Sequence, residues 1–387
     1  MSPKKVQVIR GYLGFLYLAL TKYNELKRII VSVTNDLVTD QRVDKTCDVL
    51  TEIGFEVILV GRKLKNSLPI HRKYSTKRFR LVFNKGILFY AEYNTRLFLF
   101  LLFSRKSFLF SNDLDTLLPN YLISKIQKKK LFFDSHELFS EIPELVNKKR
   151  VKNVWIYLEK IIIPRLENII TVSDSIKNYY HNLYGISATV LRNIPKIEKI
   201  SQKNFEIDTK GRKVILYQGS VNIGRGIELM IDTMPLLNEY LFIVIGDGDI
   251  IDKLKTKVIK LSLENRVKFL GKKTPQELKT LTPNAVIGMS LEEDLGLNYR
   301  YALPNKIFDY IHANVPIIVS DLPEMRSVIK KYAVGELLIE RTPKNLAKII
   351  TNMTNNSYKK EMKAAKEELN WSKEKEKLTS IFSKLDK

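Results

Sequence analysis

Two cationic side chains in the second half of the chain, Arg225 and Lys306, stand in sequence patterns that suit the binding of phosphate. Arg225 lies in the glycine-containing stretch Gln218–Gly226, where a guanidinium can bind two phosphate oxygens at once. Lys306 follows Pro304, whose fixed backbone angle suits the start of a helix, so its ammonium is expected near the positive end of a helix dipole. Because fixed cations stabilise a departing diphosphate, we predict a nucleotide-diphosphate site that needs no metal ion.

The segment around Lys306 also carries a carboxylate on the same expected helical face. Asp309 lies three residues after Lys306, which places it one turn along the helix, within reach of ribose hydroxyls. Asn314 is expected to end this helix in the left-handed conformation, before the strand Pro316–Ser320. An ordinary ion pair on the surface of an amphipathic helix is the alternative interpretation.

The stretch Gln218–Gly226 is expected to form a phosphate-binding loop. Its glycines at 219, 224 and 226 would let backbone amides approach a diphosphate at the start of a helix. A glycine loop is a weak signal by itself, but Lys306 in the same domain gives two cations for one pyrophosphate. The first predicted strand, Ile29–Val33, is not followed by the glycine-rich dinucleotide fingerprint, so a nicotinamide or flavin cofactor is not expected.

The charge composition points to an acidic partner. The 387 residues include 65 lysines and arginines against 42 aspartates and glutamates, a formal net charge of +23. Such a balance indicates attraction to nucleic acid, an anionic membrane surface or phosphorylated substrates, and a solvated basic surface is the alternative. The single cysteine, Cys47, excludes an internal disulfide framework and suits a reducing cytoplasm. With four histidines and one cysteine, no metal-ligand cluster is expected.

The order of the predicted elements indicates an α/β protein with parallel sheets. Short β-branched runs alternate with amphipathic helical segments, and the pattern starts afresh in the second half. We predict two tandem Rossmann-like domains with a cleft between them. The expected parts are an N-terminal extension at 1–28, a first domain at 29–195, a linker at 196–212, a second domain at 213–358, and a C-terminal helix at 359–387 that packs back onto the body. The extension can form a membrane-surface helix or a packing helix.

Polar side chains follow several predicted strands of the first half. Open α/β sheets bind ligands at the carboxyl ends of their strands, so these side chains are candidates for a ligand cleft, with helix or turn capping as the alternative. His136, in an Asp-Ser-His-Glu loop, can hydrogen-bond a substrate or serve as a structural histidine. The candidate side chains besides His136 are Asn35, Asp36, Asp40, Asp113 and Glu137.

These motifs together resemble a bacterial glycosyltransferase of the GT-B type, close to glycosyltransferase family 4 (glycosyl transferases group 1). The resemblance covers nearly the whole chain beyond about residue 28. It implies two Rossmann-like domains, a nucleotide-sugar donor bound mainly by the second, and retaining transfer without a metal ion. The stretches that carry it are Asn35–Arg42, Asn112–Pro119, Asp134–Glu144, Gly219–Gly226, Gly246–Gly248 and Leu303–Tyr310 with Pro316–Ser320.

The resemblance assigns roles residue by residue. The family's phosphate-binding lysine maps to Arg225, and its E-x7-E motif falls at Tyr301 and Asp309, with Asp309 as the ribose ligand. The implied catalytic residues are His136, which would meet the donor sugar, Arg225 and Lys306. The implied donor-binding residues are Gly219, Ser220, Gly224, Gly226, Gly246, Leu270, Pro304, Asn305 and Asp309. The acceptor-side candidates are Asn35, Asp36, Asp40, Asp113 and Glu137.

The function that this resemblance implies is transfer of a sugar from a nucleotide-diphosphate sugar to a cell-surface glycan, such as lipopolysaccharide, or to a lipid-linked acceptor. Neither a cofactor nor a specific nucleic acid is expected. The basic surface would hold a cytoplasmic enzyme against the anionic inner membrane. A nucleotide-sugar epimerase of GT-B type and a non-catalytic polyanion-binding protein are the alternatives.

Overall fold

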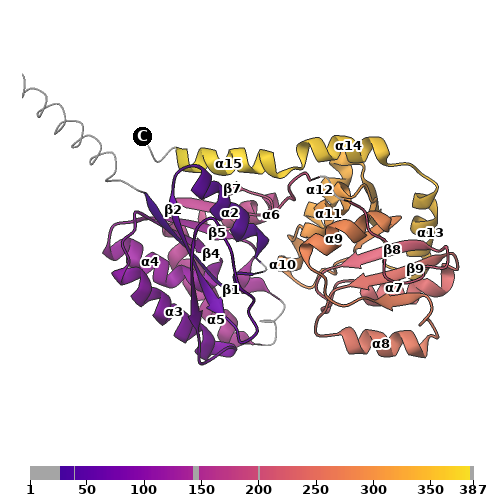
Figure 1. Cartoon of the computed structure of the whole chain (residues 1–387), viewed down its shortest axis with the longest axis horizontal. Coiled ribbons are helices and arrows are strands. Elements are labelled where there is room, and N and C mark those ends of the chain that lie inside the picture. The colour runs from indigo at the N-terminus through magenta and orange to yellow at the C-terminus, as the bar shows by residue number, and fades with distance from the viewer. Residues whose placement is uncertain (1–26, 39, 143–147, 199–200, 384–387) are drawn as a thin grey trace, which may run out of the picture. The chain divides into compact units, whose positions relative to one another are not determined.

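The computed structural model describes residues 27–38, 40–142, 148–198 and 201–383 (Figure 1). The expected N-terminal extension therefore lies almost entirely outside the described residues. The chain divides into two compact units. Unit 1 holds the described residues up to Ser135, together with Leu158–Ile169 and residues from Ile381 onward. Unit 2 holds His136–Tyr157 and Ile170–Ser380.

The first sheet has seven strands in the order β3-β2-β1-β4-β5-β6-β7. The pairs β1–β2, β1–β4, β2–β3 and β4–β5 are all parallel. Its strands are β1 (Arg28–Asp36), β2 (Glu56–Lys63), β3 (Ser75–Arg80), β4 (Phe108–Asn112), β5 (Lys130–Ser135), β6 (Asn168–Thr171) and β7 (Ala188–Val190). The helices of this part are α2 (Gln41–Glu52), α3 (Gly86–Phe103), α4 (Leu117–Ile126), α5 (Lys149–Ile162) and α6 (Asp174–Tyr184), with 3-10 turns η2 (Leu114–Thr116), η3 (Phe139–Glu141) and η5 (Ile163–Arg165).

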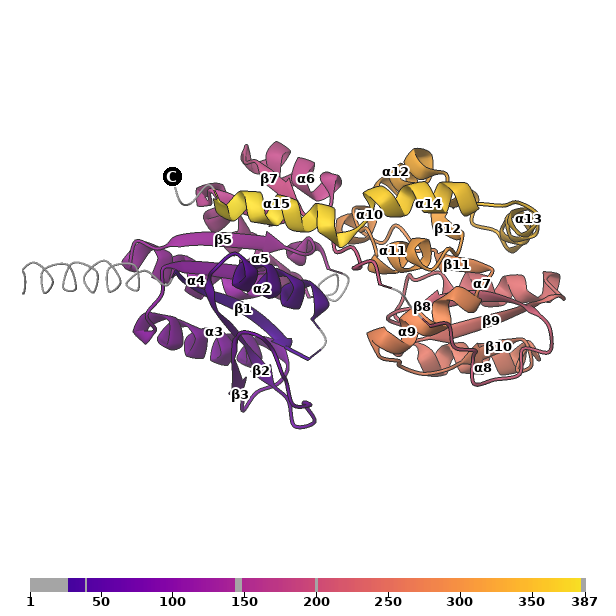
Figure 2. The same ribbon diagram turned by 45° about the horizontal axis from the view of Figure 1, so that its top comes forward.

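The second sheet has six strands in the order β10-β9-β8-β11-β12-β13, and all of its neighbouring strands pair in parallel (Figure 2). Its strands are β8 (Lys213–Gln218), β9 (Tyr240–Ile245), β10 (Val267–Phe269), β11 (Ile287–Ser290), β12 (Ile317–Ser320) and β13 (Gly335–Leu338). Its helices are α7 (Ile227–Thr233), α8 (Ile251–Lys260), α9 (Pro275–Leu281), α10 (Leu297–Arg300), α11 (Asn305–His312), α12 (Pro323–Tyr332) and α13 (Pro343–Thr354). The chain continues with α14 (Lys359–Glu368) and α15 (Trp371–Ser383).

The second sheet is buried on both faces because its strands are apolar on both. In β8, Val214 and Leu216 join one hydrophobic cluster, whereas Ile215 and Tyr217 join the other. Successive side chains of a strand point to opposite faces, so an uninterrupted apolar run fills two layers of helices. The fold class predicted from the sequence, two parallel-sheet α/β domains of the GT-B type, is confirmed.

Helix α7 ends at Thr233 and continues as the 3-10 turn Met234–Leu236, because Pro235 has no amide hydrogen to extend the helix.

The C-terminal segment differs from its prediction. In place of one final helix there are two, α14 and α15, separated at Leu369 and Asn370. Phe382 of the second packs within unit 1, with its ring centroid 4.4 Å from that of Phe132. Among the described residues, no helix is both long enough and apolar enough to span a bilayer.

Candidate active site

Three segments of unit 2 meet at one edge of the second sheet. The loop Gly219–Gly226 follows β8, and Glu292 follows β11 by two residues. β8 and β11 are neighbouring parallel strands, so their carboxyl ends lie at the same edge of the sheet. Lys306 comes from the first turn of α11, an eight-residue helix whose buried face packs against the sheet. The topology of the sheet therefore brings both predicted cations to one place.

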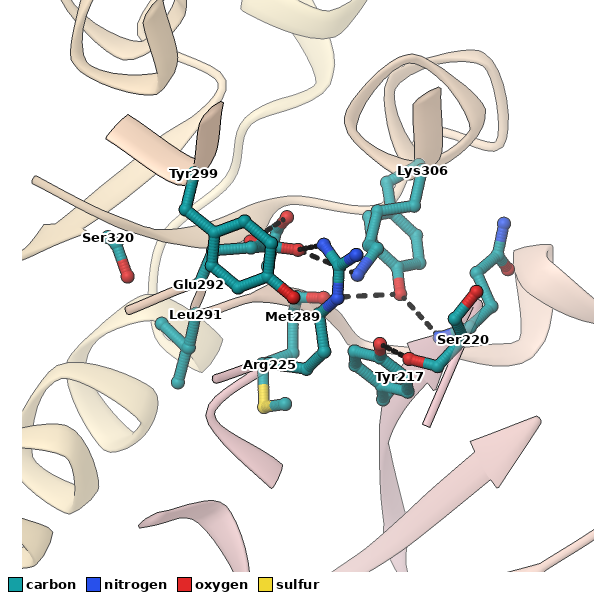
Figure 3. A network of polar contacts seen from close by, with 12 residues as sticks. Tyr217, Ser220, Arg225, Met289, Leu291, Glu292, Tyr299, Lys306 and Ser320 are labelled. Atoms are coloured by element: carbon teal, nitrogen blue, oxygen red, sulfur yellow. Dashed lines mark hydrogen bonds and ion pairs between the residues drawn. The ribbon is translucent and has the colours of Figure 1, made fainter. Parts of the chain in front are cut away.

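Arg225 and Lys306 converge on a single carboxylate oxygen of Glu292 (Figure 3). Lys306 Nζ lies 2.9 Å from Glu292 Oε1, and Arg225 Nη1 lies 3.6 Å from the same atom. The Glu292 side chain is fully buried, and those of Lys306 and Arg225 are 9% and 23% exposed. The second carboxylate oxygen accepts a hydrogen bond of 2.7 Å from Ser290 Oγ. The cluster thus holds two positive charges against one negative charge.

The members of this cluster keep their charges at neutral pH. Burial of Glu292 would raise its pKa, but the neighbouring Lys306 and Arg225 outweigh burial and lower the pKa below its ordinary value. Burial of Lys306 would lower its pKa, but Glu292 raises the pKa above the ordinary lysine value. The cluster is therefore a buried ion triad with a net positive charge, and an anion such as a diphosphate would complete its charge balance.

Two tyrosine rings orient the cations. Lys306 Nζ lies 4.2 Å from the ring centroid of Tyr217, and the guanidinium carbon of Arg225 lies 4.7 Å from that of Tyr299. Tyr217 OH donates a 2.5 Å hydrogen bond to the backbone oxygen of Ser220, which fixes the ring below the loop. Cation–π contacts hold a charged group in one direction without neutralising it.

The backbone around Glu292 is held by Arg341. Its guanidinium donates hydrogen bonds to the backbone oxygens of Leu291 at 3.1 Å and Glu292 at 3.3 Å, and to Ser320 Oγ at 2.7 Å. The amide of the next residue, Glu293, donates to the backbone oxygen of Gly224 at 2.8 Å. These bonds connect the segment after β11 to the glycine loop, so Arg341 is a positioning residue for the triad.

A cavity of about 440 Å³ lies on the other side of Gly219 from Lys306, and its volume suits a nucleotide-sized ligand. Gly219 forms part of its wall with φ at +132°, and a Cβ added there would lie 3.5 Å from Lys306 Cε. The cavity and the triad therefore share a wall. The other lining residues are Ser220, Ile245, Gly246, Asp247, Gly248, Lys272, Lys273 and Leu278.

The donor-side candidates on α11 lie as follows. Pro304 is the N-cap residue of the helix, one position earlier than its predicted role as first helical residue, because its ψ of 134° is extended. Asn305 is exposed at the first helical position. Asp309 is half-buried and accepts a 3.1 Å hydrogen bond from Gln218 Nε2 at the end of β8. Asn314 has φ at +59°, as predicted for the residue that ends the helix.

The remaining donor-side candidates have structural contacts of their own. Gly226, with φ at +73°, is the N-cap residue of α7, and Gly224 has φ at +79°. Gly246 has φ at +154° and lies against the backbone oxygen of Gly219. Leu270 donates its amide to Val244 and packs against a hydrophobic cluster, so it does not line the cavity. The structure thus groups the glycines with the triad but places Leu270 in a supporting position.

Part of this chain is similar in sequence to known glycosyltransferases. Residues 198–371 match the family model described as glycosyl transferases group 1, a range that contains the triad and the cavity. These residues are therefore similar to a glycosyl transferases group 1 domain. A curated relative, the O-antigen chain mannosyltransferase RfbU of Salmonella typhimurium, is 24% identical over 45% of this chain and 47% of its own length. The chain spans about half the length of the curated relatives it matches.

Solved structures similar to this chain share the fold over nearly its whole length. Sucrose-phosphate synthase from Thermosynechococcus elongatus superposes with a TM-score of 0.75 at 13% identity, covering 93% of this chain and 99% of that one. HepE of Anabaena, in complex with UDP-glucose, superposes with a TM-score of 0.69 at 13% identity, covering 92% and 99%. At such identities the likeness shows the fold alone, and the shared two-domain GT-B fold extends beyond residues 198–371, which the family model matches.

His136 belongs to the same compact unit as residues 198–371, the range that the family model matches. It directly follows β5 and is half-buried. The two residues after His136 are held by Asn298 of α10. The Asn298 Oδ1 accepts a hydrogen bond from the amide of Leu138 at 3.0 Å, and the Asn298 Nδ2 donates one to Glu137 at 3.2 Å. Asn298 is a positioning residue that sequence reasoning missed. The position of Glu137 suits this structural role as well as the predicted acceptor side.

The acceptor-side candidates of unit 1 lie at or just after the carboxyl ends of the neighbouring parallel strands β1 and β4. Asn35 is exposed and donates to Asp40 Oδ2 at 3.3 Å. Asp36 accepts from Ser67 Oγ at 2.5 Å and lies 3.7 Å from Arg78. Asp40 caps α2 by accepting the amide of Val43 at 3.1 Å. Asp113, with φ at +57°, precedes η2. Asp36 and Asp40 thus already have structural partners, and the acceptor role stays a prediction.

Sequence reasoning missed Glu292. The E-x7-E pattern placed its first position at Tyr301, but the side chain of Tyr301 packs near Tyr179, with ring centroids 6.5 Å apart, and its backbone oxygen accepts from Ser173 Oγ at 3.1 Å. The carboxylate that contacts the cations is Glu292, two residues after β11. The signal that would have found it is its position at the carboxyl end of a strand next to the glycine-loop strand.

The stability that Glu292 contributes should fall in acid. A depressed folded-state pKa means that this stability is fully present above the unfolded value near 4.5 and is lost as the pH falls through the folded pKa. We expect Glu292→Gln to lower the free energy of unfolding by about 3–5 kcal/mol at neutral pH, because it leaves Lys306 buried without a charged partner. The difference from wild type should shrink below pH 4.5. Urea unfolding across this range measures it.

An exposed ion pair in the same unit provides the control. Glu239 pairs with Lys213 at 3.5 Å but is 77% exposed, so Glu239→Gln should change stability little at any pH. A Glu292→Gln effect that is equally small would show that the triad does not stabilise the folded state.

Proposed function

We propose that this protein is a retaining, metal-independent glycosyltransferase that moves a sugar from a nucleotide-diphosphate sugar to a cell-surface glycan or lipid-linked acceptor. The observation that carries the proposal is the convergence of Arg225 and Lys306 on one oxygen of Glu292, inside the region matched by the group 1 family model. Two fixed cations with one carboxylate leave positive charge for a diphosphate leaving group. The adjoining cavity would hold the nucleoside.

The donor would bind with its nucleoside in the cavity and its diphosphate beside the triad. Gly219 and Ser220 would border the diphosphate, and Asp309 would accept hydrogen bonds from the ribose. His136 is proposed to contact the transferred sugar. HepE is described in complex with UDP-glucose and RfbU as a mannosyltransferase of O-antigen chains, and these descriptions support a nucleotide sugar and a surface glycan as the substrate classes. A cytoplasmic enzyme held at the anionic inner membrane would meet lipid-linked acceptors there.

The positive charge of the triad suggests a direct test of the metal-independent mechanism. Transfer from UDP-, GDP- or ADP-sugars to a lipid-linked saccharide should continue in excess EDTA, since the leaving group is stabilised by side chains. Proton NMR of the product should show the anomeric configuration of the donor. Turnover of the donor without acceptor would indicate an epimerase, and a complete loss of transfer in EDTA that Mg²⁺ restores would contradict the metal-independent mechanism.

Arg225 should contribute to donor binding less than Lys306. Its guanidinium is more exposed and farther from Glu292, so we expect Arg225→Ala to lower kcat/KM for the donor by about 10–100-fold. Arg300→Ala is a matched control, because Arg300 lies in the same unit but pairs at the surface with Asp294. Steady-state transfer assays at varied donor concentration compare the two. Equal activities in the two variants would remove Arg225 from the site.

A further inference from the structure

The outer faces of α3 and α4 in unit 1 carry large apolar side chains that the fold leaves exposed. On α4, Leu118, Leu122 and Ile126 recur every four residues and are 36%, 41% and 60% exposed. On α3, Leu99 and Phe103 have the same spacing and are 48% and 82% exposed. Residues four apart lie on one face of a helix, so each helix presents an apolar stripe to solvent.

The two stripes belong to one surface, because α3 and α4 pack side by side (Figures 1 and 2). Gln127 Nε2 donates to the backbone oxygen of Leu102 at 2.9 Å, and Lys106 Nζ donates to Gln127 Oε1 at 2.6 Å. These hydrogen bonds join the carboxyl ends of the two helices. Phe103 and Ile126 are the last residues of those helices, so the most exposed side chain of each stripe lies at the joined end.

A basic cavity of about 320 Å³ lies at the same end of α4. Glu167 is the one carboxylate among its described lining residues, which also include five cationic side chains. Lys125 lies three residues after Leu122 on α4, so this cation borders the apolar stripe. The five cationic residues are Lys125, Lys128, Lys129, Lys130 and Arg165.

We propose that this α3–α4 surface docks onto an anionic phospholipid bilayer. Apolar side chains on one helical face enter the boundary between headgroups and acyl chains, and neighbouring lysines bind the lipid phosphates. The exposed apolar stripes can enter the acyl-chain boundary, and the neighbouring cluster of cations can bind the lipid phosphates. The inference rests on the proposed function only in that a lipid-linked acceptor would be met at the same membrane, since docking itself requires neither donor nor acceptor.

Charge argues for lipid over a second copy of the chain. Two copies joined through this surface would bring their lysine clusters together, and like charges at an interface oppose association. The whole chain carries a formal net charge of +23, which disfavours self-association further and favours an anionic surface. The bilayer is therefore the occupant that the surface fits best.

Vesicle flotation with the full chain tests the proposal. The wild type should bind phosphatidylcholine vesicles that contain phosphatidylglycerol, bind pure phosphatidylcholine far less, and dissociate as salt is raised. Lys125→Gln with Lys128→Gln should weaken binding by about 25-fold, because each lysine near an anionic surface contributes about fivefold. Phe103→Ser with Ile126→Ser should weaken it by about tenfold or more through the loss of buried apolar area.

Helix α8 of unit 2 offers a matched control, because it carries the exposed Ile259 beside Lys255 and Lys260. Ile259→Ser and the pair Lys255→Gln with Lys260→Gln should leave vesicle binding unchanged. Thermal unfolding should be near the wild-type temperature for every variant, since all the replaced side chains are exposed.

Four results would overturn the proposal. Wild-type vesicle binding in both α3–α4 variants would place the membrane contact elsewhere, and binding lost equally in the α8 variants would show a diffuse charge effect. A wild-type dimer in sedimentation velocity that dissociates in Phe103→Ser with Ile126→Ser would make the surface an interface between copies. Tight binding of duplex DNA without vesicle binding would make it a nucleic-acid surface. Because none of these assays uses a sugar donor, a failure here is distinct from a failure of the transferase proposal.

Discussion

Replacement of Lys306 by methionine should lower kcat/KM for the nucleotide-sugar donor by about 10²–10³-fold, the range seen when one group that stabilises developing charge is removed. Lys306 is the better placed cation of the triad, 2.9 Å from Glu292 and 9% exposed. Its charge acts in a site with little water, where screening is weak. Transfer assays and titration calorimetry with the nucleoside diphosphate measure the effect. Methionine keeps the length and apolar character of the stem, so the loss reports on the ammonium group.

The same substitution also strips Glu292 of its nearest cation, so a loss of folding has to be separated from a loss of chemistry. We expect Lys306→Met to destabilise the protein by about 3–5 kcal/mol and the double variant Lys306→Met with Glu292→Gln to recover much of that stability. Diphosphate binding and transfer should stay lost in the double variant. Lys213→Met is the control, because Lys213 also lies over a tyrosine ring and beside a glutamate, but at the surface. Near-wild-type transfer in a folded Lys306→Met protein would contradict the proposed site.

The fold and the two cations could be predicted from the sequence, because each depends on a local sequence pattern. Runs such as Val214–Tyr217 are apolar on both faces, which is typical of a strand in a doubly covered parallel sheet. Pro304 before the helix and Asn314 after it predicted the limits of α11 to within one residue. Lys306 was identifiable because a helix start has a known position and a known polarity.

The residues that contact the two cations could not be predicted from the sequence, because burial depends on the tertiary structure. Glu292 stands in a segment with Glu293 and Asp294 that reads as a solvated acidic loop, and only the pairing of β11 beside β8 places one of these carboxylates inside. Arg341 contacts the backbone of Glu292, although the strands β12 and β13 separate the two residues in the sequence. Asn298 lies in a four-residue helix that has no sequence signature. Sequence spacing carries no information on such contacts.

The second large effect is expected in unit 1, at the buried pair of Arg42 and Asp134. Arg42 Nε and Nη2 donate to the two oxygens of Asp134 at 2.9 and 2.7 Å, and the side chains are 5% and 0% exposed. The pair joins the start of α2 to the end of β5. We expect Arg42→Met to lower the free energy of unfolding by about 3–5 kcal/mol, because it removes the cation that donates two hydrogen bonds to a buried carboxylate. Urea unfolding measures the change.

The cost of Arg42→Met should come mainly from the uncompensated charge, since a bidentate pair in the interior gains little net energy over neutral groups of similar size. Arg42→Met with Asp134→Asn should therefore be more stable than Arg42→Met alone. Arg28→Met is the control on the same sheet: Arg28 pairs with Glu56 at 2.6 Å, but the two side chains are 30% and 35% exposed, so the change should cost less than about 1 kcal/mol. Because Asp134 lies two residues before His136, transfer should fall in Arg42→Met and recover in part in the double variant. Equal losses of stability in Arg42→Met and Arg28→Met would show that burial does not govern this pair.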